Sequence, residues 1–388
     1  MRVLAACSLG GAGHLTPLLP ALAAARRRGD ETLLVGPPSL REMVELAGYP
    51  FLSGGEPPEV EVAPIRERLP VAPAREASIL GNRELFGRLA TGAMLPAMAR
   101  ICAGWRPDLV LREPCEYASA VVAGRTAIPA VQVAISLAEA EAGSIATAAP
   151  ALESHRRGLV EELLSSPYLT RFPASLDPSP FANTVRFREV GSPAPAPLPA
   201  WWGGSEAPLV YVTFGTVLGH MSIAADVYRT ALKAVADRDL RVLLTVGRRF
   251  DRSSLGPVPA NVRVEPWVEQ ADVLQEADLV VCHGGSGTSF GAMAAGVPVV
   301  AVPLFGEQFS NGRRIEQAGA GLVVETESGT SGPRRVVGES DVPRIADCIE
   351  AVLGNPSYRQ RAGRIASEMA AAPTIDQVLD GLLTAGGT

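Results

Sequence analysis

A proline- and glycine-rich stretch near the middle of the chain, SPAPAPLPAWWGGSEAP at residues 192–208, constrains the fold more than any other feature. Neither a helix nor a central strand continues easily through such residues. On both sides of it, short apolar runs alternate with longer helical patterns, as in parallel α/β sheets. The 388 residues also exceed what a single core usually serves. We therefore predict two Rossmann-like, doubly wound α/β domains, residues 1–191 and 209–388, joined by a linker at 192–208.

The apolar runs predict buried strands in each half. In the first half these are residues 2–7, 31–36, 108–113 and 129–134, with a helix at 15–29. In the second half they are residues 209–215, 241–247, 262–267, 278–285 and 297–303. Residues 136–175 are predicted to be irregular. Ligands of open α/β sheets bind at the carboxyl ends of the strands, which is where the motifs below occur.

Charge and cysteine usage exclude several classes of protein. The net charge of −6 provides no basic field for nucleic acid or an anionic membrane surface. The five cysteines are scattered without CxxC spacing, so neither a disulfide framework nor a zinc site is indicated. No apolar stretch approaches the ~20 residues of a membrane helix, and no signal peptide is evident. We expect a cytoplasmic protein, either a monomer or a homodimer.

The loop after the first predicted strand, SLGGAGHLTP at residues 8–17, contains the candidate base His14. Its glycines do not spell GxGxxG, and no acidic residue ends the second predicted strand, which argues against a nicotinamide cofactor. Near a helix N-terminus the neutral form of His14 is favoured, and a neutral imidazole accepts a proton. The alternative is a histidine that only hydrogen-bonds its own loop.

A carboxylate, Glu113, ends the predicted strand at residues 108–113, and Pro114 prevents the strand from continuing. A carboxylate there could accept the Nδ1 proton of a histidine and fix its tautomer. Glu116 lies three residues on and is an equally available partner for His14. Each of the two carboxylates could also be an ordinary solvated side chain.

The stretch HGGSGTSFGAMAAGVP at residues 283–298 predicts a phosphate-binding turn. Its glycines let the backbone close around an anion, and its hydroxyl residues open a helix whose free N–H groups suit phosphate. A capped helix behind a glycine turn is the alternative. The residues that carry the prediction are His283, Gly284, Gly285, Ser286, Gly287, Thr288 and Ser289.

Other strand ends offer groups for the rest of a nucleotide sugar. Thr216 follows the strand ending at Gly215 and offers a hydroxyl and an N–H to an anion. Trp267 could stack on a nucleobase that Gln270 reads. Three polar side chains suited to sugar hydroxyls follow the last predicted strand: Glu307, Gln308 and Asn311.

Taken with their order along the chain, these motifs resemble those of the GT-B nucleotide-sugar glycosyltransferases, in particular the bacterial antibiotic type related to plant small-molecule enzymes. GGAGHLTPLLPALAAARRRG and HGGSGTSFGAMAAGVPVVAVPLFGEQFSNGRR carry the resemblance, which covers nearly the whole chain. It implies two domains facing across a cleft, the first binding the acceptor and the second the nucleotide sugar. It also implies a C-terminal helix that packs back toward the N-terminal domain.

The resemblance assigns roles to matching residues. His14 matches the general base, and Glu113 stands where the family usually has Asp. The diphosphate grip is matched by Thr216, His283, Gly285, Ser286, Gly287 and Thr288. The positions that bind the nucleobase are Trp267, Val268 and Gln270, and those that hold the donor sugar are Glu307 and Gln308.

The predicted reaction is an inverting, metal-independent sugar transfer without a cofactor. Gly291 occupies a position where plant relatives carry a Glu that binds the ribose diol, which favours a dTDP-sugar over a UDP-sugar. A small apolar aglycone, such as a polyketide, would suit the apolar side chains within residues 55–100, although each could equally be core: Ile79, Leu80, Leu85, Phe86, Leu89, Met94, Leu95 and Met98. A sugar-nucleotide epimerase and an inactive partner of a glycosyltransferase remain the alternatives. The sugar, the aglycone and the attacking atom are open.

Overall fold

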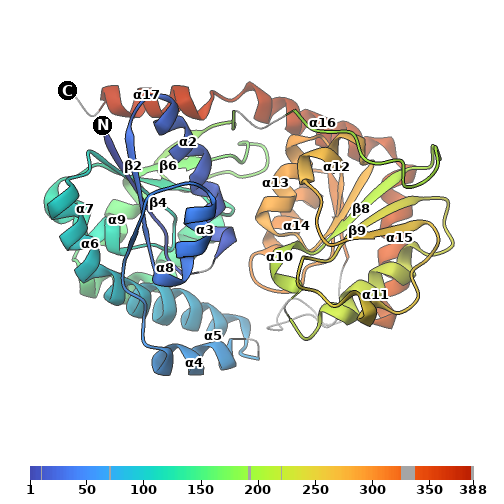
Figure 1. Ribbon diagram of the computed structural model, residues 1–388, viewed down its shortest axis with the longest axis horizontal. Coiled ribbons are helices and arrows are strands. Elements are labelled where there is room, and N and C mark those ends of the chain that lie inside the picture. Colours follow the sequence, from blue (N-terminus) through green and yellow to red (C-terminus); the bar gives the residue numbers. More distant parts are fainter. Residues whose placement is uncertain (10, 70, 191–193, 220, 325–336, 386–388) are drawn as a thin grey trace. The chain divides into compact units, whose positions relative to one another are not determined.

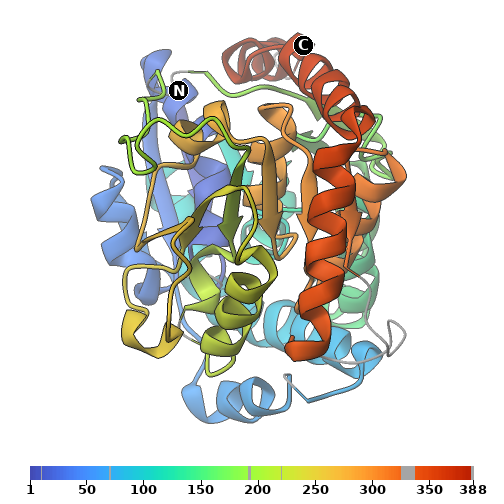
Figure 2. The same cartoon turned by 90° about the vertical axis from the view of Figure 1, so that its right-hand side faces the viewer.

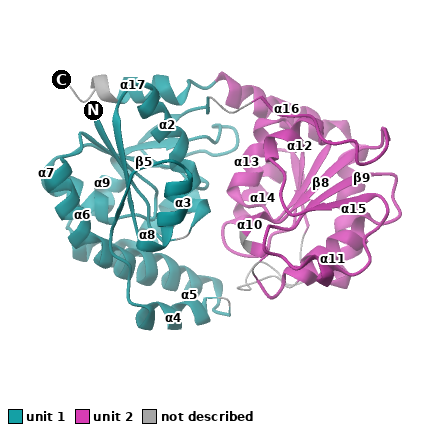
Figure 3. Cartoon of the chain, in the orientation of Figure 1, with its two compact units in different colours: residues 1–191, 372–388 teal, residues 192–371 magenta. Residues whose placement is uncertain are grey.

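The computed structural model describes residues 1–9, 11–69, 71–190, 194–219, 221–324 and 337–385. The chain forms two compact units, residues 1–191 with 372–388 and residues 192–371 (Figure 3). The proline-rich segment thus counts with the second unit, where the Trp202 Nε1 donates to the Asn261 carbonyl at 3.2 Å. No helix among the described residues combines the length and apolarity needed to span a bilayer.

The first unit contains a sheet of seven parallel strands in the order β3-β2-β1-β4-β5-β6-β7. The strands are β1 (Arg2–Ala6), β2 (Glu31–Gly36), β3 (Phe51–Ser53), β4 (Leu109–Arg112), β5 (Ala130–Val133), β6 (Pro167–Thr170) and β7 (Asn183–Arg186). Chain order reverses between β1 and β4, where Ala6 pairs with Arg112. The loops after these two central strands therefore leave the same edge of the sheet side by side.

Helices cover both faces of this sheet (Figure 1). Alternate residues of β1 point to opposite faces, so Val3 and Ala5 belong to one apolar cluster and Leu4 and Ala6 to another. The helices are α1 (Ala12–Leu15), α2 (Leu19–Arg27), α3 (Arg41–Leu46), α4 (Glu59–Arg68), α5 (Ala74–Ser78), a π-helix η3 (Ile79–Ala90), α6 (Thr91–Trp105), α7 (Ala118–Thr126), α8 (Ala138–His155) and α9 (Leu159–Ser165).

A helix from the far end of the chain, α17 (Ile375–Ala385), belongs to the first unit and packs on α2. Ile375, Val378 and Leu379 are buried in the same apolar cluster as Leu22 of α2. Asp376 receives two hydrogen bonds from the Arg27 guanidinium, at 2.9 and 2.8 Å. The core of the first unit is therefore completed by residues that follow the whole second unit in sequence.

The second unit has six parallel strands in the order β10-β9-β8-β11-β12-β13, again reversing at its centre. They are β8 (Leu209–Thr213), β9 (Arg241–Thr245), β10 (Val262–Glu265), β11 (Leu279–Cys282), β12 (Val299–Ala301) and β13 (Gly321–Val323). The helices are α10 (Gly215–Leu218), α11 (Ala224–Val235), α12 (Gln270–Glu276), α13 (Ser286–Ala294), α14 (Gln308–Gln317), α15 (Val342–Gly354) and α16 (Pro356–Ala371). Figure 2 looks onto this unit, with α11 and α15 in front of its sheet.

Every strand predicted from the apolar runs is present, but each is as long as predicted or shorter, because flanking residues belong to loops. The prediction that residues 136–175 are irregular was wrong: they form α8, α9 and β6. The alanine-rich sequence of α8 has no strong helical periodicity of apolar residues, which is why the helix was not predicted. In the structure α8 packs closely on η3. Of the apolar side chains considered for the acceptor, four are core residues: Leu80, Leu89, Met94 and Met98.

Candidate active site

His14 is presented by the loop between β1 and α2. Gly11, at φ 68°, starts α1, and its carbonyl accepts hydrogen bonds from the N–H groups of His14 and Leu15 at 3.2 and 3.1 Å. The imidazole stacks on the Phe86 ring with centroids 5.5 Å apart and an angle of 22°. Its side chain keeps 17% of its surface exposed, so it is held on one side and accessible on another.

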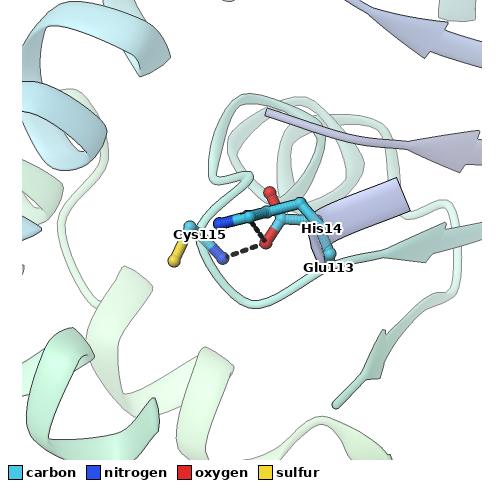
Figure 4. Close-up of side chains that lie close together, drawn as sticks. All are labelled: His14, Glu113 and Cys115. Atoms are coloured by element: carbon cyan, nitrogen blue, oxygen red, sulfur yellow. Dashed lines mark hydrogen bonds and ion pairs between the residues drawn. The ribbon is translucent and has the colours of Figure 1, made fainter. Parts of the chain in front are cut away.

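Glu113 follows β4 and is fully buried. Its Oε2 lies 3.2 Å from the Nδ1 of His14 (Figure 4). Backbone N–H groups hold the carboxylate: Ser8 donates to Oε1 at 3.0 Å and Cys115 donates to Oε2 at 2.7 Å. A buried carboxylate with two fixed donors has little freedom to rotate, so the extra methylene of Glu relative to Asp still leaves it beside His14.

The other carboxylate considered, Glu116, serves a different purpose. It is buried, and it accepts hydrogen bonds from both the N–H and the hydroxyl of Ser119 in the first turn of α7. Burial raises its pKa above the ordinary value for a glutamate. Of the two candidates, Glu113 is therefore the one that contacts His14.

Arg112 braces the loop that carries Glu113. Its guanidinium is 1% exposed and donates to the carbonyls of Glu116 and Pro114 at 2.6 and 2.8 Å, and to Gln132 Oε1 at 2.5 Å. These contacts fix both ends of the turn after β4. The sequence gives no sign of this role, because an Arg at a strand end carries no signal of burial.

A third buried carboxyl, Glu141 on α8, lies close enough to Glu113 to be affected by its charge. Its Oε1 accepts hydrogen bonds from the N–H groups of Ile135 and Ser136, each at 2.7 Å. Burial raises the pKa of Glu141 to about 8, and the charge of Glu113 acts in the same direction. Glu141 is therefore protonated and uncharged at neutral pH, so it adds no negative charge near His14 and Glu113.

In the second unit, the turn at residues 283–288 follows β11 and lies beside the end of β8, where Cys282 pairs with Thr213. His283 packs against two glycines. A Cβ at Gly215 would lie 2.9 Å from the His283 ring, and one at Gly285 would overlap its Nε2. Glycine at these positions is what gives the imidazole its place between the two strand ends.

Burial lowers the pKa of His283 to about 4. The imidazole is therefore neutral at physiological pH and carries one N–H. Its Nδ1 is buried and has no hydrogen-bond partner among the described residues. A neutral imidazole with an unused polar atom can donate or accept one further hydrogen bond, depending on its tautomer.

Polar residues of α14 support the same turn. The Asn311 amide donates to the Gly284 carbonyl at 2.8 Å and to the Ser286 hydroxyl at 3.1 Å. Gln308 is 3% exposed, and its Oε1 accepts from the N–H groups of Leu304 and Phe305 at 2.9 and 3.1 Å. The side chains predicted to read sugar hydroxyls thus hold backbone in place, except Glu307, which is exposed.

The predicted nucleobase residues divide into two groups. Gln270 donates to the Thr288 carbonyl at 3.3 Å, and a Cβ at Gly291 would overlap its Nε2. The absence of a side chain at Gly291 therefore has a packing reason, independent of any ribose. Trp267 is 42% exposed, with the Arg248 guanidinium 5.5 Å from its ring centre, while Val268 is half-buried. Arg248 gave no sequence signal.

The structure brings together residues within each unit. His14 and Glu113 meet in the first, and His283, Gly285, Ser286 and Thr288 share one turn in the second. Gly287 lies in the same turn, at the start of α13, and Thr216 lies on α10; both are exposed. Phe86, which the sequence suggested only as an apolar lining residue, is the ring that positions His14.

Family models and curated relatives that match both units of this chain are of one kind. The models described as Erythromycin biosynthesis protein CIII-like, N-terminal domain and C-terminal domain match residues 24–215 and 229–384. The L-demethylnoviosyl transferase of Streptomyces niveus is 30% identical over 390 residues, covering 98% of this chain and 97% of that protein. The elloramycin glycosyltransferase ElmGT of Streptomyces olivaceus is 31% identical over 404 residues, covering 100% and 98%.

Solved structures share the architecture. Spinosyn rhamnosyltransferase SpnG, in a structure complexed with thymidine diphosphate, superposes with a TM-score of 0.76. The two sequences are 24% identical, and the match covers 98% of this chain and all of that one. This likeness concerns the arrangement of the strands and helices.

Proposed function

Because this chain belongs to the erythromycin biosynthesis protein CIII-like family of antibiotic glycosyltransferases, we propose that it transfers a deoxysugar from a dTDP-sugar to an apolar aglycone with inversion. The predicted family and the GT-B fold are confirmed, and the chain is a glycosyltransferase that acts on natural-product aglycones. Its relatives are named as transferases, so we retain neither the epimerase nor the inactive partner as its function.

One observation carries the proposed mechanism: the His14 Nδ1 lies 3.2 Å from a Glu113 carboxylate that is fully buried and held by backbone donors. With its Nδ1 proton directed at Glu113, the imidazole keeps a lone pair on Nε2 for the acceptor hydroxyl. As the acceptor oxygen forms its bond to the anomeric carbon, its proton passes to Nε2. General-base assistance of this kind contributes about 10²–10⁴-fold.

The bond from the anomeric carbon to the diphosphate breaks in the same displacement, and negative charge develops on the leaving oxygens. We propose that His283 and the N–H groups of the first turn of α13, at Gly285, Ser286, Gly287 and Thr288, stabilise this charge, together with Thr216. The neutral His283 would donate its N–H. We propose that these fixed dipoles take the place of a divalent metal in the reaction.

For the donor, Trp267 offers a half-exposed ring on which a base can stack, and Val268 and Gln270 follow it toward α13. Two observations support thymidine diphosphate over UDP. Gly291 has no side chain that could bind a ribose hydroxyl, and a protein of the same fold binds thymidine diphosphate. Glu307 is the exposed residue proposed to contact the donor sugar, with Gln308 holding its loop.

We propose that the acceptor binds to the first unit, next to His14. Phe86 stacks on the imidazole, and Ile79 and Leu85 of the same π-helix are half-buried. A π-helix is uncommon and often occurs at functional sites. An apolar, polyketide-like aglycone would pack on this surface and direct its hydroxyl at His14.

The test is a transfer assay with dTDP- and UDP-activated deoxysugars and a panel of polyketide aglycones, in buffer with a chelator. We expect turnover with the dTDP donor and an inverted anomeric centre in the product. His14→Ala should lower kcat by about 10²–10⁴-fold and leave dTDP affinity near that of the wild type. Wild-type turnover by this variant would remove His14 from the mechanism, and tighter binding of UDP than dTDP would overturn the donor assignment.

A further inference from the structure

A third potential ligand lies beside His14 and Glu113. Three potential ligand atoms lie within 4.8 Å of one another: a ring nitrogen of His14, a carboxylate oxygen of Glu113 and the sulfur of Cys115. Figure 4 shows the three side chains at the end of β4, with Cys115 on the loop that follows Glu113. The proposed reaction uses the first two residues and assigns no task to the thiol.

The three residues are largely preorganised. Two backbone N–H groups hold the Glu113 carboxylate, and one of them belongs to Cys115 itself. Stacking on Phe86 restricts the His14 ring. The Cys115 side chain is half-buried and so remains accessible from solvent. Ligands that are fixed before binding lose little conformational entropy when an ion arrives.

One nitrogen, one carboxylate oxygen and one thiolate sulfur form a ligand set suited to zinc rather than to magnesium or calcium, which prefer oxygen. Zinc bonds of about 2.0–2.3 Å place the ligand atoms of a tetrahedron about 3.3–3.6 Å apart. The His14 Nδ1 and Glu113 Oε2 are already 3.2 Å apart. Because the three ligand atoms lie within 4.8 Å of one another, rotation of the Cys115 side chain has to bring its sulfur closer by at most ~1.5 Å for this geometry.

We propose that His14, Glu113 and Cys115 form an inhibitory site for Zn²⁺, an inference that rests on the proposed role of His14 as the base. The ion displaces the thiol proton to solvent. If it binds Nδ1, the remaining imidazole proton moves to Nε2, which then has no lone pair. If it binds Nε2, the lone pair itself is occupied. In both cases the acceptor hydroxyl keeps its proton and transfer stops.

The first measurement is binding of metal alone to the full-length chain, without donor or acceptor. Zn²⁺ affinity is measured by competition with a chromophoric chelator, and Co²⁺ reports a bound thiolate through its near-ultraviolet charge-transfer absorption. We expect one ion per chain and a thiolate band. Cys115→Ser and His14→Ala should each abolish the band or weaken Zn²⁺ binding beyond the ~10–100-fold that loss of a second-shell partner costs.

Cys348→Ser is the matched control, since Cys348 is also half-buried but belongs to the second unit. It should bind zinc as the wild type does. Cys115→Ser that retains wild-type affinity, or a wild type without a thiolate band, overturns the inference.

Activity is measured separately. Zn²⁺ should inhibit transfer by the wild type, a chelator should restore it, and Cys115→Ser should resist inhibition. A chain that binds zinc through these residues but transfers no sugar even when a chelator has removed the zinc would refute the proposed function and leave the site standing. A chain that transfers sugar but binds no zinc at these residues would refute the zinc site and leave the proposed function standing.

Discussion

Replacing Glu141 by Gln should change how the stability of the first unit depends on pH. Burial raises the pKa of Glu141 to about 8 in the folded chain, whereas an unfolded glutamate titrates near its ordinary value of about 4.3. Between these two values the folded state holds a proton that the unfolded state has released. Stability therefore falls as pH rises through this window, because the unfolded state binds fewer protons. Gln is neutral throughout, so the variant lacks this loss.

The magnitude follows from the window alone. Each pH unit changes the difference in free energy of unfolding between variant and wild type by about 1.4 kcal/mol. Raising the pH from about 5.5 to 7.0 should therefore stabilise Glu141→Gln relative to the wild type by about 2 kcal/mol. This slope holds as long as the folded-state pKa lies about one unit or more above 7. Gln also keeps a carbonyl oxygen for the N–H groups of Ile135 and Ser136, which limits other changes.

Hydrogen exchange is the assay, because it reads the two units separately. The ratio of protection between variant and wild type in β1 peptides should rise about 30-fold between the two pH values. Peptides from β8, in the second unit, should show no such change. Glu139→Gln, two residues away on α8 and exposed, is the matched control and should leave both units unaffected. A β1 ratio that is the same at both pH values would refute the burial argument.

Three further predictions concern other residues. His283→Gln should weaken dTDP binding. In the wild type, the bound diphosphate should raise the low pKa of His283, so dTDP affinity should increase as the pH falls. The variant should lack this increase, and calorimetry across pH 5–8 checks both expectations. Gly291→Ala should displace the flexible Gln270 amide and weaken dTDP by roughly 2–10-fold, with little change in thermal stability. Arg112→Met should cost the first unit about 3 kcal/mol or more in urea unfolding, since three buried acceptors lose their donor; stability like the wild type's would mean that water replaces the guanidinium.

The sequence predicted the central strands well because buried parallel strands such as Leu209–Thr213 are continuous apolar runs. The short edge strands β3, β7 and β13 were missed, since three or four half-buried residues carry no distinctive pattern. The pairing of His14 with Glu113 could be predicted because neighbouring strand ends bring their loops together. The structural roles of Arg112, Asn311 and Gln308 could not be predicted. In sequence, a polar residue that hydrogen-bonds buried backbone looks the same as one that binds a ligand.

Helix α17 has a practical consequence for anyone recombining such enzymes. The chain leaves the first unit after residue 191 and returns to it at residue 372. A hybrid that exchanges everything after the proline-rich segment would import a foreign α17, and its residues at 375, 378, 379 and 376 would have to match the host's α2. The cleaner exchange is an insertion of residues 192–371, in which α17 stays with the parent that supplies residues 1–191.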